Sequence, residues 1–245
     1  MPDQFLTAVV TGASRGFGRA IAAALVASGT GVVGIARGER ELSAVREELG
    51  GGFTPIAADA ADEALAGDVI RRNRPGLLVL NAGAVPHMAP IHEQTWETFG
   101  RNWEADTRHV FAWTRAALRE PLAPGSVVVM SSGAVLAGSP HSGGYAAAKA
   151  GVRYIGRYAA AESERAGLGI RFVTLLPQLT PATGLGSAGV AGYAARQGVD
   201  RDTVIAGLGP VLTPDQVAKA VVDLAGDPGS AAEYQVTGGG IRPLG

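Results

Sequence analysis

Short apolar runs alternate with longer amphipathic segments along the chain. A short apolar run bounded by turn residues is typical of a buried strand, and apolar residues three to four positions apart are typical of a helix that covers it. The runs predict strands over residues 5–12, 31–36, 53–59, 76–83, 125–132, 170–177 and 233–239. The amphipathic segments predict helices over residues 16–29, 39–50, 63–73, 94–120, 143–167 and 213–226. This alternation indicates a doubly wound, mostly parallel α/β sheet with helices on both faces.

Residues 178–212 follow neither pattern and are rich in Gly, Ala and Thr. A long irregular stretch in a compact domain is usually functional or mobile, so we expect a working loop there. No linker, repeat or low-complexity segment interrupts the rhythm of strands and helices elsewhere. We therefore expect residues 1–245 to form a single domain.

Composition narrows the classes of function. The chain is 47% hydrophobic and 18% charged with a formal net charge of -1, which favours a sizeable core and argues against a nucleic-acid or membrane partner. It has no cysteine, which excludes disulfides, thiol nucleophiles and thiolate metal sites and fits a reducing compartment. Its four histidines are scattered and predict no metal site. With no visible secretion signal or apolar span, we expect a cytoplasmic protein.

The stretch TGASRGFG, residues 11–18, follows the first predicted strand and opens the first helix. Glycines at a strand-to-helix turn let the backbone approach a pyrophosphate, and a helix N-terminus supplies N–H groups and a favourable dipole. The spacing of Gly12, Gly16 and Gly18 is G-x-x-x-G-x-G, which differs from the commonest dinucleotide fingerprint. Tight packing is the alternative explanation of these glycines. Their place in a series of strands and helices favours a dinucleotide site.

The end of the second predicted strand bears on the choice of coenzyme. Dinucleotide folds that bind NAD usually carry an acidic residue there, which holds the ribose 2′-hydroxyl. Here the strand ends at Ala36, Arg37 follows, and Arg15 lies within the glycine turn. Two guanidinium groups suit a 2′-phosphate, so the sequence predicts NADP(H) rather than NAD(H). Solvated surface arginines are the alternative interpretation. Asp59, at the end of the third strand, is placed to accept a hydrogen bond from the adenine amine.

The stretch SGGYAAAKA, residues 142–150, places Tyr145 and Lys149 one helical turn apart. A cation beside a phenol favours the phenolate, and a tyrosine that titrates closer to working pH is a useful proton donor or acceptor. An ordinary amphipathic helix would show the same spacing by chance, so this pair alone decides nothing.

Taken together, these motifs resemble the short-chain dehydrogenase/reductase family in its single-domain form. The resemblance rests on T-G-x-x-x-G-x-G at 11–18, N-A-G at 81–83, a serine at the end of the fifth strand and Y-x-x-x-K at 145–149. It implies a Rossmann-type fold and an enzyme that exchanges hydride between NADP(H) and a carbonyl/alcohol pair. It also implies a substrate lid over about 184–209 and a homodimer or homotetramer built through the two long helices.

The resemblance also assigns roles to residues. Tyr145 would be the general acid/base, Lys149 would assist it and bind the nicotinamide ribose, and Ser132 would hold the substrate carbonyl. Ser131 is the other candidate, but the family's usual serine-to-tyrosine gap favours Ser132. The implied cofactor-binding residues are Gly12, Ser14, Arg15, Gly16, Phe17, Gly18, Arg37, Asp59, Ala60, Asn81, Ala82, Gly83, Tyr145, Lys149, Pro177 and Thr180.

One departure from the family pattern follows the sixth strand. Pro177 is kept, but Gln178 stands where the family usually has glycine. We expect its side chain to reach toward the nicotinamide carboxamide or to crowd it. Thr180 or Thr183 could bind that carboxamide, and the shifted spacing leaves the choice open.

A second departure lies in the predicted helix 94–120, where Asp106 best fits the position of a family asparagine and Asn102 is the other candidate. Large apolar residues recur along this helix and predict a buried stripe that includes Asp106: Trp96, Phe99, Trp103, Val110 and Trp113. We expect Asp106 to lie in the proton-relay position near Lys149. A buried carboxylate balanced by Arg108 or Arg115 is the alternative.

The leading interpretation is therefore an NADPH-dependent reductase, or the reverse dehydrogenase. A cofactor-binding protein with little or no catalysis, acting as a sensor or partner subunit, is the first alternative. An epimerase or dehydratase that recycles its cofactor is the second. The substrate is not legible from the sequence, although His87, Met88 and His141 are candidates for the mouth of its site.

Overall fold

The computed structural model describes residues 7–120 and 125–244 and contains an eight-stranded sheet. The strands run in the order β3-β2-β1-β4-β5-β6-β7-β8, and all neighbours pair in parallel except β7 and β8. Their bounds are β1 (Thr7–Thr11), β2 (Gly31–Ala36), β3 (Phe53–Ala57), β4 (Leu77–Leu80), β5 (Ser126–Met130), β6 (Arg171–Pro177), β7 (Glu233–Thr237) and β8 (Gly240–Pro243). This order confirms the predicted doubly wound sheet.

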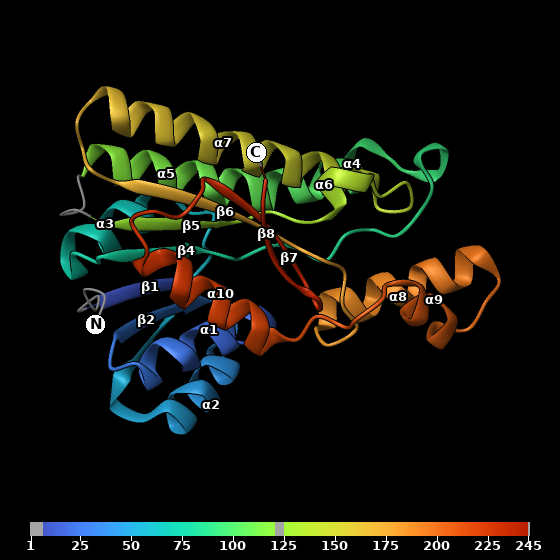
Figure 1. Cartoon of the computed structure of the whole chain (residues 1–245), viewed down its shortest axis with the longest axis horizontal. Coiled ribbons are helices and arrows are strands. Elements are labelled where there is room, and N and C mark those ends of the chain that lie inside the picture. The colour runs from blue at the N-terminus through green and yellow to red at the C-terminus, as the bar shows by residue number, and fades with distance from the viewer. Residues whose placement is uncertain (1–6, 121–124, 245) are drawn as a thin grey trace.

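Helices cover both faces of the sheet (Figure 1). Their bounds are α1 (Gly16–Ala27), α2 (Glu39–Leu49), α3 (Glu63–Asn73), α4 (Trp96–Asn102), α5 (Arg108–Arg119), α6 (Ala134–Ala137), α7 (Gly143–Arg165), α8 (Gly184–Gln197), α9 (Arg201–Gly207) and α10 (Pro214–Gly226). Buried side chains of α1, α2 and α10 form one apolar core, and those of α3, α5 and α7 form the other. Because both faces are covered, the central strands are apolar at nearly every position.

The predicted helix 94–120 is not continuous. A π-helical turn (Trp103–Thr107) separates α4 from α5. A π-turn adds a residue to the helical repeat and changes which side chains face inward. Val110 and Trp113 are buried as expected, whereas Trp96 is 83% exposed and Trp103 is 51% exposed. The predicted apolar stripe is therefore wrong in its first half.

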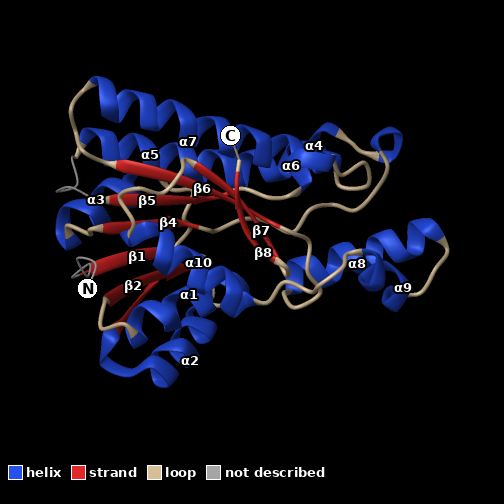
Figure 2. Cartoon of the chain, viewed as in Figure 1, coloured by secondary structure: helices blue, strands red, loops and turns tan. Residues whose placement is uncertain are grey.

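The predicted irregular stretch 178–212 is largely helical, which is a second correction. The Thr183 side chain caps α8 by accepting from Gly186 N, and the Asp200 side chain caps α9 by accepting from Thr203 N. Gly198, with φ of 66°, ends α8. These capping residues were visible in the sequence, but the many small side chains hid the helical period. In Figure 2, α8 and α9 stand off from the two helical layers.

Two further differences concern strands. The antiparallel strand β8 lies beyond the predicted final strand, and β3 is an edge strand with an exposed middle rather than a buried one. Within the described residues, none of the helices combines the length and apolar character that crossing a membrane requires.

Candidate active site

A cleft of about 2010 Å³ lies at the carboxyl ends of the parallel strands. Ligand pockets usually measure roughly 300–1,000 Å³, so this cleft has room for a dinucleotide together with a second molecule. It brings together nearly every predicted site residue, from the turn after β1 to the segment after β6. Gly18 and Asp106 are the exceptions, since both lie behind its wall.

The turn after β1 fits a pyrophosphate. Gly12 and Gly16 have φ of 69° and 54°, a conformation that residues with a side chain rarely adopt. A Cβ on Gly18 would lie 2.1 Å from the Gly12 carbonyl oxygen, so this glycine permits close packing of helix on strand. No side chain caps α1 and its first turn holds no acidic residue. The first backbone N–H groups of α1 are thus open to an anion.

The N-A-G turn after β4 supports the phosphate turn from behind. Asn81 Nδ2 donates to Thr11 O at 3.0 Å, and the Thr11 hydroxyl accepts from the backbone N of Asn81 and Ala82. Thr11 is fully buried, and its hydroxyl also donates to Val79 O. Thr11 opens the motif at 11–18 but is not among the predicted site residues, although a threonine at the end of an apolar strand was a visible signal.

The far end of the cleft fits an adenosine and its ribose substituent. Arg15 and Arg37 are exposed and line the cleft, and neither forms an ion pair within the described residues. Ala36, the last residue of β2, carries no carboxylate. Asp59 also lines the cleft, and one of its oxygens accepts from Ala61 N at 2.9 Å. These residues can hold a nicotinamide dinucleotide.

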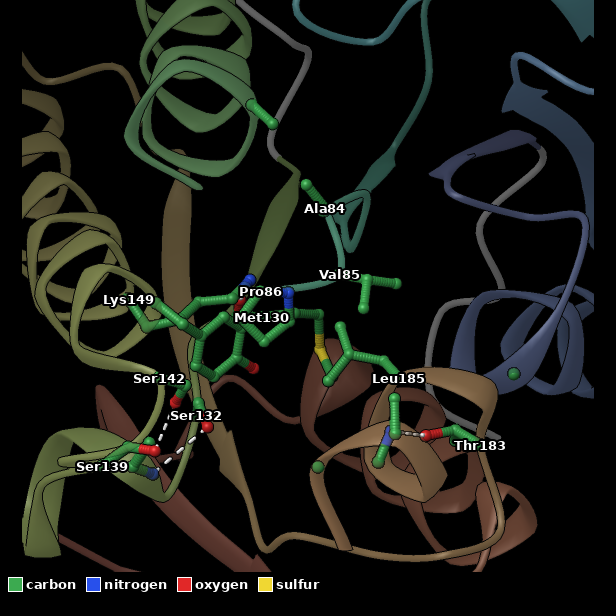
Figure 3. Close-up of a pocket in the computed structure, with 18 of the residues that line it drawn as sticks. Ala84, Val85, Pro86, Met130, Ser132, Ser139, Ser142, Lys149, Thr183 and Leu185 are labelled. Carbon is green, nitrogen blue, oxygen red and sulfur yellow. Dashed lines mark hydrogen bonds between the residues drawn. The ribbon is translucent and has the colours of Figure 1, made fainter. Parts of the chain in front are cut away.

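Ser132, Tyr145 and Lys149 meet at the opposite end of the cleft. Ser132 follows β5, and the other two lie on the first turns of α7, so one strand end and one helix start place all three. Figure 3 labels Ser132 and Lys149 among the side chains of this cleft. Lys149 is 5% exposed, its Nζ donates to Met130 O at 3.1 Å, and it lies 5.8 Å from the centroid of the Tyr145 ring. The lysine is thus fixed beside the phenol, in the arrangement that the sequence spacing predicts.

The two neighbouring serines differ in what their hydroxyls do. Ser131 Oγ donates to Lys149 O at 2.9 Å and so helps to position α7. Ser132 Oγ accepts from Ala134 N at 3.2 Å, which leaves its proton available to a ligand in the cleft. The geometry favours Ser132 as the residue that contacts a substrate.

Asp106 is fully buried, and its Oδ2 lies 3.3 Å from Lys149 Nζ. Its Oδ1 accepts from Ala84 N at 2.8 Å, while Asn102 Nδ2 donates to Ala84 O at 2.8 Å. Both candidates for the family's asparagine therefore hold the backbone of the same residue, Ala84, and only Asp106 reaches the lysine. Asn102 ends α4 and Asp106 lies in the π-helical turn, and both side chains are buried. The predicted contact with Lys149 is confirmed, and the arginine partners are wrong.

Burial and charge set the ionisation of this region. Burial disfavours the charged lysine, but the Asp106 carboxylate and Tyr145 outweigh it and raise the pKa of Lys149 above its ordinary value. His109, one turn beyond Asp106, is 1% exposed. Burial and the Lys149 charge lower its pKa to about 3, so it is neutral at physiological pH. The sequence analysis gave this histidine no place in the site.

The segment after β6 holds three residues singled out from the sequence. Gln178 lines the cleft, and its side chain is held by two hydrogen bonds: its Nε2 donates to Leu208 O at 2.6 Å and its Oε1 accepts from Gly238 N at 3.3 Å. It ties the end of α9 to the β7–β8 turn. Thr180 is buried and its hydroxyl donates to Leu212 O, whereas Thr183 lies against Gly16 of the phosphate turn. Of the two threonines left open, Thr183 is the better placed for a cofactor.

Of the three residues considered for the mouth of the substrate site, Met88 lines the cleft and His87 and His141 do not. His141 packs instead against Tyr193, with the ring centroids 6.0 Å apart.

Comparison with known proteins adds the family. Residues 6–190 match the family model described as short chain dehydrogenase. The chain is 31% identical over 233 residues to cis-4-hydroxycyclohexanecarboxylate dehydrogenase of Sinomonas cyclohexanicum, covering 91% of this chain and 90% of that protein. It is 33% identical over 130 residues to carbonyl reductase [NADPH] 2 of Sus scrofa, covering 52% and 53%.

A solved structure of 3-ketoacyl-(acyl-carrier-protein) reductase from Brucella melitensis, complexed with NADH, superimposes with a TM-score of 0.81 at 24% identity. It covers 95% of this chain and 97% of the other and supports the fold. The family model spans most of the chain, and the described cleft presents the family's motifs in one place. The chain belongs to the short-chain dehydrogenase/reductase family of oxidoreductases, whose members use a nicotinamide cofactor.

Proposed function

We propose that this protein is an NADP(H)-dependent oxidoreductase that interconverts a carbonyl compound and its alcohol, with Tyr145 as general acid/base. The observation that carries the proposal is the grouping of Ser132, Tyr145 and Lys149 at one end of a cleft whose other end is the phosphate turn. The active-site lysine and serine have the hydrogen bonds that such roles need, so the site is complete within the described chain.

In the reductive direction the nicotinamide, when bound, supplies hydride to the carbonyl carbon. Negative charge then develops on the carbonyl oxygen. Ser132 donates a hydrogen bond to that oxygen and Tyr145 transfers its proton to it, which together stabilise the transition state. Lys149 holds its charge beside the tyrosine and favours the phenolate that remains. Asp106 offsets part of that charge, and through Ala84 it fixes the turn after β4 against α5.

The preference for NADP(H) is supported by Arg15, Arg37 and the missing carboxylate at Ala36. The relative from Sus scrofa is named for NADPH and the Brucella structure holds NADH, so membership of the family does not settle the choice. We expect NADPH to bind more tightly than NADH in direct titration. The double change Ala36→Asp with Arg37→Ala should reverse the order. Arg40→Ala is the matched control, since Arg40 is exposed on α2 but lies outside the cleft lining. A wild-type preference for NADH contradicts this assignment.

Turnover is tested by mixing the protein with NADPH and a panel of ketones and aldehydes and following coenzyme absorbance. Because the Sinomonas relative is named for 4-hydroxycyclohexanecarboxylate, an alicyclic alcohol that carries a carboxylate, cyclohexanone and 4-oxocyclohexanecarboxylate both belong in the first panel. Oxidation of NADPH supports the reductase. A protein that shifts coenzyme fluorescence but never oxidises it with any carbonyl compound is the non-catalytic alternative. Loss of substrate without net change in NADPH would indicate an epimerase or dehydratase.

Homo-oligomerisation is supported by five large side chains that stand exposed on α4, the π-helical turn, α5 and α7: Trp96, Trp103, Phe111, Tyr154 and Tyr158. An exposed apolar patch of this kind marks an interaction surface more often than not. We expect a dimer or tetramer in solution. Light scattering at several concentrations measures it, and a monomer throughout would contradict it.

A further inference from the structure

The walls around Ser132 and Tyr145 differ in character from the rest of the cleft. Three segments contribute to them beside α4, whose Phe99 packs against Gly143 and Gly144: the loop after β4 (residues 84–88), the stretch from Ser132 to Tyr145, and residues 178–208 with α8 and α9. In these segments the described side chains that line the cleft are aliphatic, hydroxyl, amide, thioether or phenol groups, and none carries a formal charge.

From these walls we infer that the enzyme selects an uncharged substrate, a ketone or aldehyde with an apolar body, and discriminates against carbonyl compounds that carry a carboxylate or phosphate. The inference rests on the proposed function and specifies its substrate class.

Apolar groups meet around the catalytic end from all three walls. Val85 and Pro86 of the first wall, Leu185 of α8 and Met130 all line the cleft and are labelled in Figure 3. The remaining apolar lining groups are Met88, Ala134, Ala137, Ala188, Val204 and Leu208. A hydrocarbon body placed here gains stability by leaving water.

The formal charges of the cleft lie elsewhere, apart from Lys149. Arg15, Arg37, Glu41 and Asp59 line the end proposed for the adenosine. Glu97, Arg101, Glu104 and Arg108 belong to α4, the π-helical turn and α5. Lys149 is buried, pairs with Asp106 and donates to Met130 O, so its charge is already balanced by a carboxylate before a substrate binds. An anion between the three walls would lose its water shell without gaining a cation, which is costly.

The segment with α8 forms one side of this space and contacts the other two walls. Tyr193 Oη and Ser139 Oγ are hydrogen bonded at 2.5 Å, and Ser139 bonds in turn to Ser142. Ser142 O accepts from Tyr145 N at 2.7 Å, so α8 is tied to the first turn of α7. On its other side α8 packs against Met88, since a Cβ on Gly192 would lie 2.8 Å from Met88 Cε. A substrate group in this part of the cleft therefore lies between α8, the loop after β4 and the start of α7.

The test compares cyclohexanones that carry a neutral or a negatively charged group at the same ring position. We would measure kcat/KM with NADPH for 4-methylcyclohexanone, 4-oxocyclohexanecarboxamide and 4-oxocyclohexanecarboxylate. The carboxamide and carboxylate are nearly isosteric, so their ratio reports charge alone. We expect the carboxamide to exceed the carboxylate by at least ~10-fold and the methyl compound to exceed both, within the range by which pocket contacts discriminate substrates. A carboxylate that equals or exceeds the carboxamide overturns the inference.

Two variants that each add one positive charge to α8 test whether the uncharged walls cause the discrimination against the carboxylate. Leu185→Arg places a cation inside the cleft, and Ala195→Arg places the same charge on the exposed, non-lining side of α8. Leu185→Arg should raise the carboxylate-to-carboxamide ratio by about 10-fold or more, while Ala195→Arg leaves it at the wild-type value. A ratio that Leu185→Arg does not move contradicts the assignment of this wall.

Binding of the same three ketones to the protein–NADPH complex, measured by calorimetry, separates this inference from the proposed function. Preferential binding of the neutral ketones without any turnover supports the substrate class and refutes the reductase. Preferential turnover of the carboxylate supports the reductase and refutes the substrate class. Failure of all three to bind refutes the inference directly.

Discussion

Helix α7 holds two buried carboxylates with three basic residues, and it holds them differently. Arg153 and Arg157 both grip Glu233 of β7, with five hydrogen bonds between 2.6 and 3.1 Å. Lys149, one turn before Arg153, reaches Asp106 only at 3.3 Å, and Asp106 Oδ2 has no hydrogen-bond partner among the described residues. The same helix thus carries a saturated ion cluster at its middle and an unsaturated one at the catalytic end.

The difference separates two uses of charge in one fold. Burial acts to raise the pKa of Glu233, but the hydrogen bonds and charges of Arg157 and Arg153 outweigh it and lower this pKa to about 2. These ion pairs hold β7 against α7. Asp106 and Lys149 keep unused hydrogen-bonding capacity. They lie beside Tyr145, where a change in their charge would change the pKa of the phenol. An ion pair that is incompletely hydrogen bonded in a buried place marks the functional site.

The largest expected effect breaks the catalytic end alone. Tyr145→Phe removes the proton donor without touching either carboxylate, so kcat should fall by at least ~10²-fold, the usual contribution of a general acid. Thermal unfolding and NADPH affinity should stay near wild type. Steady-state kinetics with the best ketone measures kcat, and calorimetry measures both the thermal unfolding and the NADPH affinity. Near-normal turnover would remove Tyr145 from the mechanism.

The same carboxylate-to-amide change at the two clusters should give opposite results, and Glu233→Gln comes first. It leaves Arg153, whose side chain is 18% exposed, without its partner, while Arg157 at 43% can turn to water. We expect a loss of about 2 kcal/mol in the free energy of unfolding, by the usual size of hydrogen bonds to charged groups. Chemical denaturation measures it. Activity per folded molecule should be unchanged. A fall in kcat without loss of stability would show that the Glu233 cluster also acts on the reaction, which contradicts the division of the two clusters.

Acid titration sharpens the same point. The pKa of Glu233 is about 2 in the folded protein and about 4.5 when exposed, so the cluster contributes its full stability above pH 4.5. That contribution is lost as pH falls from about 4.5 toward 2. The difference in unfolding free energy between wild type and Glu233→Gln should therefore narrow over this range. Other acid-sensitive groups, such as His109, are present in both proteins, so their contributions drop out of the difference. A difference that is constant with pH would show that the charge of Glu233 does not stabilise the fold.

The smallest expected effect is at Asp106. Asp106→Asn keeps the shape and the hydrogen bond from Ala84 N but removes the charge that offsets Lys149. The lysine then favours the Tyr145 phenolate more strongly, so the alkaline limb of the pH–rate profile for reduction should move to lower pH by about half a unit, the scale of a partly screened neighbouring charge. Most of the activity should remain at neutral pH. Identical profiles would place Asp106 in a purely structural role, and Asn102→Ala would then be the variant to measure.

Much of this molecule is legible in its local patterns. The apolar runs predict the parallel strands, the glycines at 12, 16 and 18 predict the phosphate turn, and the spacing of Tyr145 and Lys149 predicts their proximity. These features depend on neighbours within one or two turns of chain, which periodicity and backbone preference control directly. The predicted contact of Asp106 with Lys149 is also present, although the π-helical turn that carries Asp106 was not predicted.

Other features depend on tertiary contacts. A π-helical turn at Trp103–Thr107 cannot be inferred from an apolar stripe, because it is fixed by packing against α7 and by the grip of Asn102 and Asp106 on Ala84. Gln178 looked like a residue of the cofactor site, yet its hydrogen-bond partners at Leu208 and Gly238 lie 30 and 60 residues away in the sequence. The sequence determined most of the strands and helices and the pairing of Tyr145 with Lys149. Only the folded chain decided how α8 meets Ser139 and Met88, since such contacts join segments whose separation no local pattern encodes.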